Sequence, residues 1–306
     1  MKHFLSLTDL SGDEIQHLLD LAVKLKDEWK AGGNQGQLAG QTLGMVFQKP
    51  SLRTRVSFDM GMIHLGGQAL YLSPNEIQLG VRESVADVAR VLSRYVDGIM
   101  ARVFSHNDIL ELAQYASIPV INGLSNYNHP CQGMADLLTI QEKHGRLAGL
   151  KVTYVGDGNN VARTLMFGAA KLGARFAIAT PAGYALAAGD VTLAQQMAAE
   201  SGGAINVFTD PQAAVAGADV IYTDTWASMG QEEQAATRRQ VFPPYQVNQV
   251  LLQGASPNVI VMHCLPAHRG QEITNPVADG PHSVLFDQAE NRLHAQKAIL
   301  VELMGE

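Results

Sequence analysis

The sequence contains only two cysteines, Cys131 and Cys264, which lie far apart along the chain. Two cysteines cannot supply a disulfide framework, so we expect a reducing, cytoplasmic location. The first residues carry Asp9, Asp13 and Glu14 and lack the apolar core of a secretory signal peptide. No apolar run approaches the length of a membrane span. Together these absences predict a soluble cytoplasmic protein.

Basic residues are scarce as well. The chain has 22 Lys and Arg against 29 Asp and Glu, which gives a formal net charge of −7. An acidic chain without a basic tail is a poor ligand for nucleic acid or an anionic membrane, so neither is expected as a partner. Any anion must therefore bind where positive charge is locally concentrated. The stretch "KPSLRTR" is such a place, because it holds Lys49, Arg53 and Arg55.

The order of apolar and amphipathic segments predicts the fold class. The 306 residues, 46% of them hydrophobic, are enough for two domains. In the first half, strand-like runs at 42–47, 69–72, 98–102 and 119–122 alternate with helical patterns, and the alternation restarts at "KVTYVGD". This rhythm predicts two doubly wound parallel-sheet α/β domains. The expected boundaries are 1–145 for the first domain, 146–285 for the second, and 286–306 for a C-terminal helix that returns to the first domain.

Polar clusters follow the predicted strands at six equivalent positions. In parallel α/β sheets, ligands bind beyond the carboxyl ends of the strands. The clusters are "KPSLRTR", Arg102 and "NYNHPCQ" in the first half, and "GDGNN", "DTWASMG" and "HCLPAHRG" in the second. Because they share this position, we expect them to converge on one active-site cleft between the two halves.

Two first-half clusters are suited to an anion and a carbonyl group. Ser51 or Pro50 precedes a helix, whose first-turn N–H groups and dipole favour an anion. Arg53 and Arg55 add guanidinium groups that match phosphate. The alternative is a capped helix with solvated arginines. In "NHPCQ", His129 is able to donate to a carbonyl oxygen or to move a proton near neutral pH, with an ordinary turn residue as the alternative.

The second-half clusters argue against a nucleotide cofactor. "GDGNN" lacks the third glycine of a dinucleotide fingerprint, the next strand ends without a ribose-binding acid, and the Walker lysine pattern is absent. "HCLPAHRG" leaves three alternatives for Cys264: a thiolate nucleophile with His263 as its base, a metal ligand, or part of a polar wall that positions a substrate. Neighbouring strand residues point to opposite faces, and the His and Cys residues lack paired ligand spacing. We therefore predict neither a cofactor nor a metal site.

These motifs, in this order and spacing, resemble the aspartate/ornithine carbamoyltransferase family over essentially the whole chain. The combination of "DTWASMG" with "HCLP" is similar to the branch that acts on ornithine. The resemblance implies transfer of the carbamoyl group of carbamoyl phosphate to the δ-amine of L-ornithine, which gives L-citrulline and phosphate. It also implies a homotrimer or a multiple of trimers, in which Gln78 reaches carbamoyl phosphate in a neighbouring subunit.

The resemblance assigns roles to particular positions. The catalytic residues would be Arg53, Thr54, Arg102, His129 and Cys264. Carbamoyl phosphate would be bound by Ser51, Leu52, Arg53, Thr54, Gln78, Arg102, His129, Pro130, Cys131, Gln132, Cys264, Leu265 and Arg292. Ornithine would be bound by Asn160, Asp224, Ser228, Met229, Cys264 and Leu265. The amine would attack directly, with arginine, threonine and histidine donors stabilising the oxyanion, and Cys264 is a hypothetical aid to loss of the amine proton.

Two positions depart from the family's usual residues: Leu52 and Cys131 stand where Thr is common. Because the backbone N–H of residue 52 survives the change, we still expect phosphate to bind there. "SLRTR" also occurs in relatives that act on N-acylated ornithine, so N-acylornithine or putrescine is the alternative acceptor. Aspartate would need additional cations, and a sensor of carbamoyl phosphate would not need the second-half clusters. The direction of use, arginine synthesis or citrulline breakdown, stays open at this point.

Overall fold

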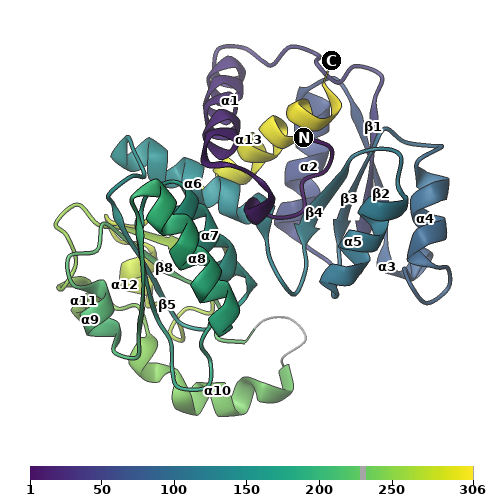
Figure 1. Ribbon diagram of the computed structural model, residues 1–306. Coiled ribbons are helices and arrows are strands. Elements are labelled where there is room, and N and C mark those ends of the chain that lie inside the picture. Colours follow the sequence, from purple (N-terminus) through teal and green to yellow (C-terminus); the bar gives the residue numbers. More distant parts are fainter. Residues whose placement is uncertain (228–231, 306) are drawn as a thin grey trace. The chain divides into compact units, whose positions relative to one another are not determined.

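The computed structural model describes residues 1–227 and 232–305. The chain divides into two compact units, one formed by Met1–Leu138 with Glu290–Glu306 and the other by Thr139–Ala289. Both divisions fall within helices, α6 (Pro130–His144) and α13 (Leu285–Met304). Each unit contains one parallel sheet with helices on both faces (Figure 1). This confirms the predicted fold class of two doubly wound parallel-sheet α/β domains.

The first unit contains a four-stranded parallel sheet with the strand order β2-β1-β3-β4. Its strands are β1 (Thr42–Phe47), β2 (Gln68–Leu72), β3 (Gly98–Arg102) and β4 (Val120–Leu124). Its helical segments, besides its parts of α6 and α13, are η1 (Leu7–Asp9), α1 (Gly12–Lys30), α2 (Leu52–His64), α3 (Pro74–Ile77), α4 (Val85–Leu92) and α5 (His106–Tyr115). All four strands correspond to strands predicted from the sequence, with small shifts at their ends.

Different helices cover the two faces of this sheet. Ile99 of β3 packs in one cluster with Val88 of α4 and Ile109 of α5. On the other side lie α1, α2 and α13 (Figure 1), where Gly61 of α2 faces Leu300 of α13. Right-handed crossovers produce this division, because β1 connects to β2 in one direction and β2 to β3 in the other. On the same face as α2 lies α13, a helix from the end of the chain, which packs beside it.

The second unit contains a five-stranded parallel sheet with the strand order β7-β6-β5-β8-β9. Its strands are β5 (Lys151–Val155), β6 (Arg175–Ala179), β7 (Ala204–Phe208), β8 (Val220–Thr223) and β9 (Ile260–His263). Its helical segments are α7 (Asn160–Lys171), α8 (Ala188–Ser201), α9 (Pro211–Val215), η2 (Glu232–Gln234), α10 (Ala235–Val241), η3 (Pro243–Tyr245), α11 (Gln249–Leu252) and α12 (Asn275–Ala278). Helices α7 and α8 lie on one side of the sheet, and α9, α11 and α12 on the other (Figure 1).

The sequence pattern does not predict strand β7. This strand is at the edge of the sheet, and only Ile205 of its five residues is buried. Its sequence, "AINVF", is apolar except for Asn206, which interrupts the run, and the edge position leaves the other four residues at least partly exposed. In the part of the chain that the structure describes, no helix combines the length and apolar character needed to cross a membrane.

Each sheet has one pair of adjacent strands at which the direction of chain order reverses: β1 and β3 in the first unit, β5 and β8 in the second. Ligands of open α/β sheets bind at the carboxyl ends of such strands. At these ends lie "KPSLRTR" and Arg102, the last residue of β3, in the first unit, and "GDGNN" and "DTW" in the second. Four of the six polar clusters singled out in the sequence therefore lie where each fold places a ligand.

Candidate active site

The loop between β1 and α2 presents a helix N-terminus to any ligand. Ser51 is the N-cap residue of α2, and its Oγ accepts the N–H of Thr54 at a distance of 3.3 Å. An α-helix leaves other N–H groups of its first turn without intrahelical acceptors, and its dipole adds positive potential. The first turn of α2 contains no acidic residue, and Arg53 is its second residue. This N-terminus is therefore suited to an anion.

The other two cations of this loop have different partners. Lys49 is buried, and its Nζ lies 4.3 Å from the centre of the Phe104 ring. Arg55 is exposed, and its guanidinium carbon lies 4.0 Å from the centre of the Tyr71 ring. Both contacts are cation–π interactions. Arg53, the second residue of α2, is the third cation that the sequence brings together here.

Arg292 of α13 reaches the same N-terminus. Its guanidinium donates from Nη1 to Oε1 of Gln132, at 2.8 Å, and from Nη2 to Oγ1 of Thr54, at 3.3 Å. The same Thr54 oxygen accepts from Oγ of Ser51 at 3.1 Å. Three members of this network are buried: Arg292, Gln132 and Thr54. Packing of α13 beside α2 thus brings a residue from the end of the chain to the predicted anion site.

His129, directly before α6, is buried beside these cations. Burial lowers the pKa of His129 well below its usual value, and the positive charges of Arg292, Arg102 and Arg53 lower it further. The ring is therefore neutral at pH 7 and offers one N–H donor and one acceptor nitrogen. Arg102, at the carboxyl end of β3, is also buried. We call this set the cation cluster: Ser51, Arg53, Thr54, Arg102, His129, Gln132 and Arg292.

Four other first-unit positions were predicted to bind carbamoyl phosphate: Leu52, Gln78, Pro130 and Cys131. The side chain of Leu52 is 74% exposed on α2, and Gln78 is exposed after α3, with a φ of 45°. The thiol of Cys131 is buried and donates to the carbonyl oxygen of Asn122 at 3.3 Å. Burial raises the pKa of the Cys131 thiol to about 12, so it remains protonated at neutral pH. Pro130 is the first residue of α6, a position that suits its fixed φ.

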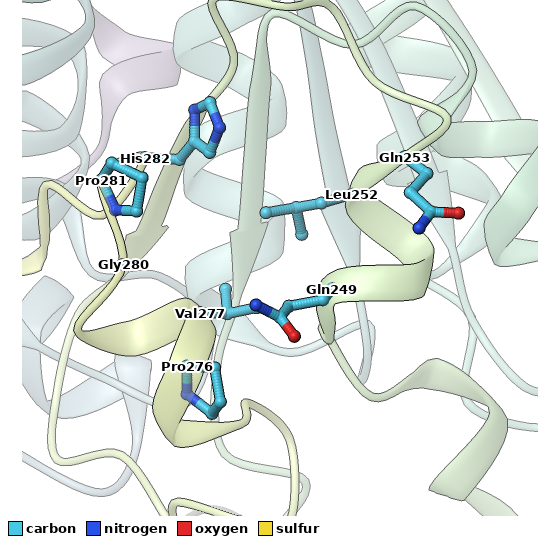
Figure 2. Close-up of a pocket in the computed structure, with 8 residues that line it drawn as sticks. All are labelled: Gln249, Leu252, Gln253, Pro276, Val277, Gly280, Pro281 and His282. Carbon is cyan, nitrogen blue, oxygen red and sulfur yellow. The ribbon is translucent and has the colours of Figure 1, made fainter.

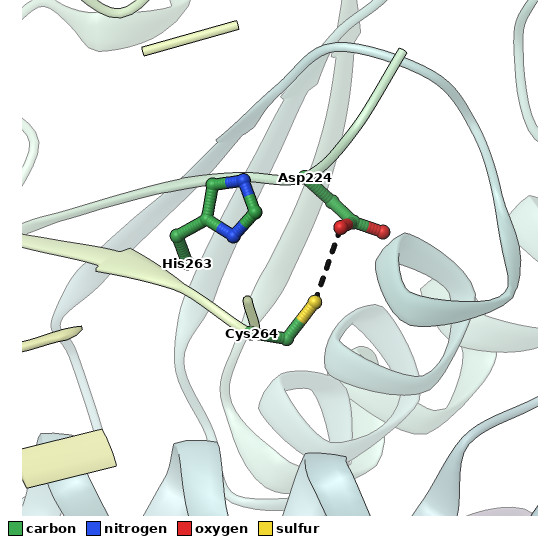
Figure 3. A group of neighbouring side chains, drawn as sticks. All are labelled: Asp224, His263 and Cys264. Atoms are coloured by element: carbon green, nitrogen blue, oxygen red, sulfur yellow. Dashed lines mark hydrogen bonds between the residues drawn. The ribbon is translucent and has the colours of Figure 1, made fainter. Parts of the chain in front are cut away.

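The second unit contains a carboxylate–thiol pair. The Cys264 thiol, just after β9, donates from Sγ to Oδ1 of Asp224, just after β8, at 3.1 Å (Figure 3). The other oxygen of Asp224, Oδ2, accepts from Nδ2 of Asn159 at 2.8 Å. Asp224 is buried, and Cys264 is half-buried. The paired strands β8 and β9 place the two residues side by side, because their registers match Thr223 with His263.

His263 supports the turn that carries Cys264 rather than acting on the thiol. Its Nδ1 accepts the N–H of Leu265 at 2.8 Å, so its proton is on Nε2, which lies 3.1 Å from Oε1 of Glu272. Both His263 and Glu272 are completely buried. Leu265 has a φ of 58°, in the left-handed region that non-glycine residues rarely adopt. The His263 contact thus stabilises an unusual backbone conformation next to Cys264.

The same contacts bear on two alternatives raised by the sequence. Ligand-type atoms of Asp224, His263 and Cys264 lie within 4.8 Å of one another, a grouping that resembles a metal site. However, one nitrogen of His263 accepts from Leu265 and the other faces Glu272. The histidine therefore has no lone pair directed at a metal ion or at the thiol. This argues against both a metal centre and a Cys–His nucleophile at Cys264.

Among the residues predicted for ornithine, Asn160 is the first residue of α7, and its carbonyl oxygen accepts from Oγ1 of Thr164 at 2.7 Å. Its neighbour Asn159, which the sequence reasoning missed, makes the contact with Asp224. Asn159 is also the N-cap of α7, since its Oδ1 accepts two N–H groups of the first turn. An Asn before a helical pattern is an N-cap signal in any sequence. Ser228 and Met229 lie outside the described residues.

A buried ion pair joins two loops of the second unit. Arg238 of α10 lies 2.8 Å from Oδ2 of Asp157 in "GDGNN" and donates to the carbonyl oxygen of Trp226 at 2.6 Å. Its guanidinium also lies over the ring of Tyr184. Burial raises the pKa of Asp157 to about 6, although Arg238 opposes the shift. Through its contacts with Asp157 and Trp226, Arg238 links the loop that holds Asn159 to the loop that holds Asp224. The sequence reasoning singled out neither partner.

The second unit also has a surface cavity of about 350 Å³ that includes none of the predicted site residues (Figure 2). It is lined by Gln249, Leu252, Gln253, Pro276, Val277, Gly280, Pro281 and His282. His282 is oriented by a contact of 2.9 Å between its Nδ1 and the carbonyl oxygen of Val259. Mostly apolar side chains of α11 and α12 face this cavity, and charged groups are not among its lining residues.

The fold and the two polar groups define a class: a two-domain α/β protein with an anion-binding group in one unit and a carboxylate–thiol group in the other. Residues 2–142 match the family model of the carbamoyl-P binding domain of aspartate/ornithine carbamoyltransferase. Residues 148–303 match the model of the Asp/Orn binding domain of the same enzymes. The chain therefore belongs to the aspartate/ornithine carbamoyltransferase family.

Individual relatives are similar along nearly the full length. The chain is 56% identical over 301 residues to the ornithine carbamoyltransferase of Thermococcus kodakarensis, which covers 98% of this chain and 96% of the relative. The solved structure of ornithine carbamoyltransferase from Pyrococcus furiosus superposes with a TM-score of 0.97 at 55% identity, covering 99% and 97% of the two chains. A solved acetylornithine transcarbamylase complexed with acetylcitrulline is also similar, with a TM-score of 0.89, 33% identity and complete coverage of both chains (100% and 100%).

Proposed function

We propose that this chain transfers the carbamoyl group of carbamoyl phosphate to the δ-amine of L-ornithine and releases L-citrulline and phosphate. The observation that carries the proposal is the cation cluster at the N-terminus of α2, in which Arg292 joins Thr54 and Gln132. The family membership of the chain and its full-length similarity to ornithine carbamoyltransferases support the choice of both substrates.

The cation cluster is proposed to bind carbamoyl phosphate. Phosphate would accept from the first-turn N–H groups of α2, including that of Leu52, and from Arg53 and Thr54. The guanidinium of Arg292 already faces Thr54 and is close enough to join them. Arg102, His129 and Gln132 would contact the carbamoyl group. These last three side chains are buried, and their hydrogen bonds would replace those that water makes to the substrate in solution.

His129 would serve as a neutral hydrogen-bond donor. The δ-amine attacks the carbonyl carbon, a C–N bond forms, and negative charge develops on the carbonyl oxygen. The C–O bond to phosphate then breaks, and phosphate leaves with the electron pair. Because burial and three guanidinium groups keep the pKa of His129 low, the ring stabilises the oxyanion without supplying a proton. Arg102 and Arg53 would supply the positive charge.

The carboxylate–thiol pair is proposed to bind ornithine. Asp224 would pair with the α-ammonium group, and Asn160, Ser228 and Met229 would contact the amino-acid end. Cys264 and Leu265 would lie along the reacting amine. Attack requires a neutral amine, so a proton has to leave: the sulfur of Cys264 would take it while the thiol proton passes to Oδ1 of Asp224. This route needs neither a covalent enzyme intermediate nor a metal ion.

We further propose that the active form is a homotrimer. One face of α2 and the adjoining edge strand β2 carry an exposed apolar stripe, Leu52, Val56, Met60, Ile63 and Leu70. The four α2 residues recur at helical spacing and so share one side of the helix. Contiguous exposed apolar surface of this kind is typical of subunit interfaces. The unusual Leu52 would then extend an interface, while its backbone N–H remains available to phosphate.

Mixing of inactive subunits tests the shared site. An Arg53→Ala subunit and a Gln78→Ala subunit would each form inactive homotrimers. Mixed trimers would regain activity, because a site with intact Arg53 could receive intact Gln78 from its neighbour. Met60→Glu should also shift the mass in solution to that of a monomer, whereas Leu110→Glu, an exposed leucine on α5, should not. Absence of activity in every mixture would remove Gln78 from the proposed site.

A cytoplasmic location is also proposed. It is supported by the free thiols of Cys131 and Cys264, since thiols persist in reducing compartments. Fractionation of cells that express the chain, followed by detection in the cytosolic fraction, tests this. Recovery of the chain in a secreted or membrane fraction would contradict it.

An acceptor panel tests the choice of ornithine against its alternatives. Purified protein is incubated with carbamoyl phosphate and one amine at a time, and ureido product and phosphate are both measured. L-ornithine should give the highest kcat/KM, ahead of N-acetylornithine, putrescine and L-aspartate. N-acetylornithine lacks the free α-ammonium that Asp224 would pair with, so it should lose that charge-assisted interaction. A preference for N-acetylornithine would support the alternative acceptor.

A further inference from the structure

Asp136 is a completely buried carboxylate in the middle of α6 that the proposed mechanism does not use. Burying a carboxylate is costly unless it is paired or hydrogen-bonded. Asp136 lies one helical turn after Gln132, on the same side of α6. Nε2 of Gln132 donates to Oδ1 of Asp136 at 2.8 Å. A buried carboxyl group one turn after a proposed substrate contact calls for a physical reason.

The contacts on either side fix the orientation of the Gln132 amide. On one side, the NH₂ group of Gln132 donates to a carboxyl oxygen of Asp136. A guanidinium is only a donor, so Arg292 has to face the oxygen, and its Nη1 is 2.8 Å from that oxygen. The two neighbours therefore require the same orientation. An amide oxygen has two acceptor positions, so after Arg292 it can accept one more hydrogen bond.

We propose that Asp136 is a positioning residue that holds the oxygen of Gln132 toward the carbamoyl NH₂ group, and so lets the site distinguish carbamoyl phosphate from acyl phosphates of similar shape. The inference rests on the proposed function. Acetyl phosphate carries a methyl group where carbamoyl phosphate carries NH₂. It would leave the second acceptor position of Gln132 unsatisfied, and sites built around such a hydrogen bond reject analogues that lack it. Binding of the phosphate group itself does not involve Asp136.

The test compares two ligands in one assay. Citrulline formation gives the KM of carbamoyl phosphate, and inhibition by acetyl phosphate gives its Ki. In Asp136→Leu, the selectivity ratio Ki/KM should fall at least about tenfold, because the amide keeps only its contact with Arg292 and its buried NH₂ group is left without the acceptor that holds it in place. The Ki of acetyl phosphate should stay within about twofold. Asp136→Asn keeps an oxygen that can accept from Gln132, so its ratio should remain within about threefold of the wild type.

A double-mutant cycle separates positioning from a merely structural role. If Asp136 acts through Gln132, Asp136→Leu should have no further effect on the ratio in a Gln132→Leu background. A structural role would instead weaken both ligands by the same factor and leave the ratio unchanged, which would overturn the inference. If Asp136→Leu does not fold, Asp136→Ala replaces it with the same expectation. Citrulline formation by the wild type is measured first: its absence would contradict the proposed function, whereas an unchanged ratio alone would contradict only the role of Asp136.

Discussion

Nδ2 of Asn159 donates a hydrogen bond to Oδ2 of Asp224 over 2.8 Å, while the oxygen of the same amide caps helix α7. The other oxygen of Asp224 accepts from Cys264. One asparagine therefore begins a helix and orients the carboxylate proposed to bind the acceptor. This side chain thus links the first turn of α7 to the loop after β8.

Asn159→Ala should raise the KM of ornithine about tenfold or more, because Asp224 loses a hydrogen bond that orients it. The KM of carbamoyl phosphate should change little. Loss of the cap should also cost about 1 kcal/mol of unfolding free energy. Steady-state kinetics with either substrate varied, together with urea unfolding, measure these effects. Asp210→Ala is the matched control, because Asp210 caps α9 of the same unit. An equal rise in the ornithine KM in both variants would show that a lost cap alone explains the effect.

Arg53→Ala should weaken carbamoyl phosphate binding at least about tenfold, because it removes charge-assisted hydrogen bonds to phosphate. The fold should persist, since Arg53 lies on the first turn of α2 rather than in the core. Protection against thermal unfolding by inorganic phosphate measures binding without turnover. Arg55→Ala, two residues further on, removes a guanidinium that stacks on Tyr71 and should leave phosphate binding nearly unchanged. Equal losses in the two variants would mean that phosphate responds to general positive charge and not to Arg53.

Cys264→Ala should lower kcat or raise the KM of ornithine, because the thiol is the hydrogen-bond donor to Oδ1 of Asp224. Cys264→Ser keeps a donor at this position and should lie between alanine and the wild type. Both parameters are measured over a range of pH, since assistance in deprotonation would change the alkaline dependence of kcat/KM. If Cys264→Ala left rate and ornithine binding intact, the thiol would have no role in the reaction.

Stability should fall in acid because of His294. Burial lowers the pKa of His294 from 6.5 to about 3, and the charges of Lys297 and Lys26 add to the shift. Between these values the unfolded chain binds a proton that the folded chain does not, so unfolding free energy decreases as the pH drops below about 6.5. By pH 5 the loss from this group should be on the order of 2 kcal/mol. Above pH 7 its contribution should be constant.

Urea unfolding at several pH values measures this dependence. In His294→Gln the decline between about pH 7.5 and pH 5 should be smaller than in the wild type, whatever the change in absolute stability. His17→Gln is the control, since the side chain of His17 is exposed at the surface of α1. An unchanged slope in His294→Gln would mean that other groups cause the acid sensitivity.

The central strands and the N-terminus of α2 could be predicted from the sequence, because each has a local signal. Strands β1 and β3 are short apolar runs, and Ser51 stands directly before a helical pattern. The edge strand β7 was not predicted, because Asn206 interrupts its short apolar run. Periodicity is a local property, so it identifies buried elements better than exposed ones.

The site could be predicted only in part, because some of its contacts join distant segments. Arg292 meets Thr54 only after α13 has packed beside α2, and no local pattern reports that packing; the resemblance to a known family supplied the residue. Asp136 and Glu272 are buried carboxylates whose partners, Gln132 and His263, are defined by three-dimensional contacts. In the sequence they resemble ordinary charged positions of a helix and a loop.

The choice between Asn159 and Asn160 shows a further limit. Both are amides in the same motif, and the resemblance to the family singled out Asn160 for ornithine. The structure adds that Asn159 is the one that contacts Asp224. Which of two adjacent side chains faces a partner depends on where the helix begins, and sequence patterns do not locate a helix end to a single residue.

Formation of citrulline is the measurement on which the assignment depends most. Purified protein is incubated with carbamoyl phosphate and L-ornithine, and citrulline and phosphate are quantified over time against a reaction without protein. The predicted result is one phosphate released for each citrulline formed, at a rate that Arg53→Ala abolishes. Absence of citrulline, with a folded protein that binds phosphate, would contradict the assignment of ornithine as the acceptor.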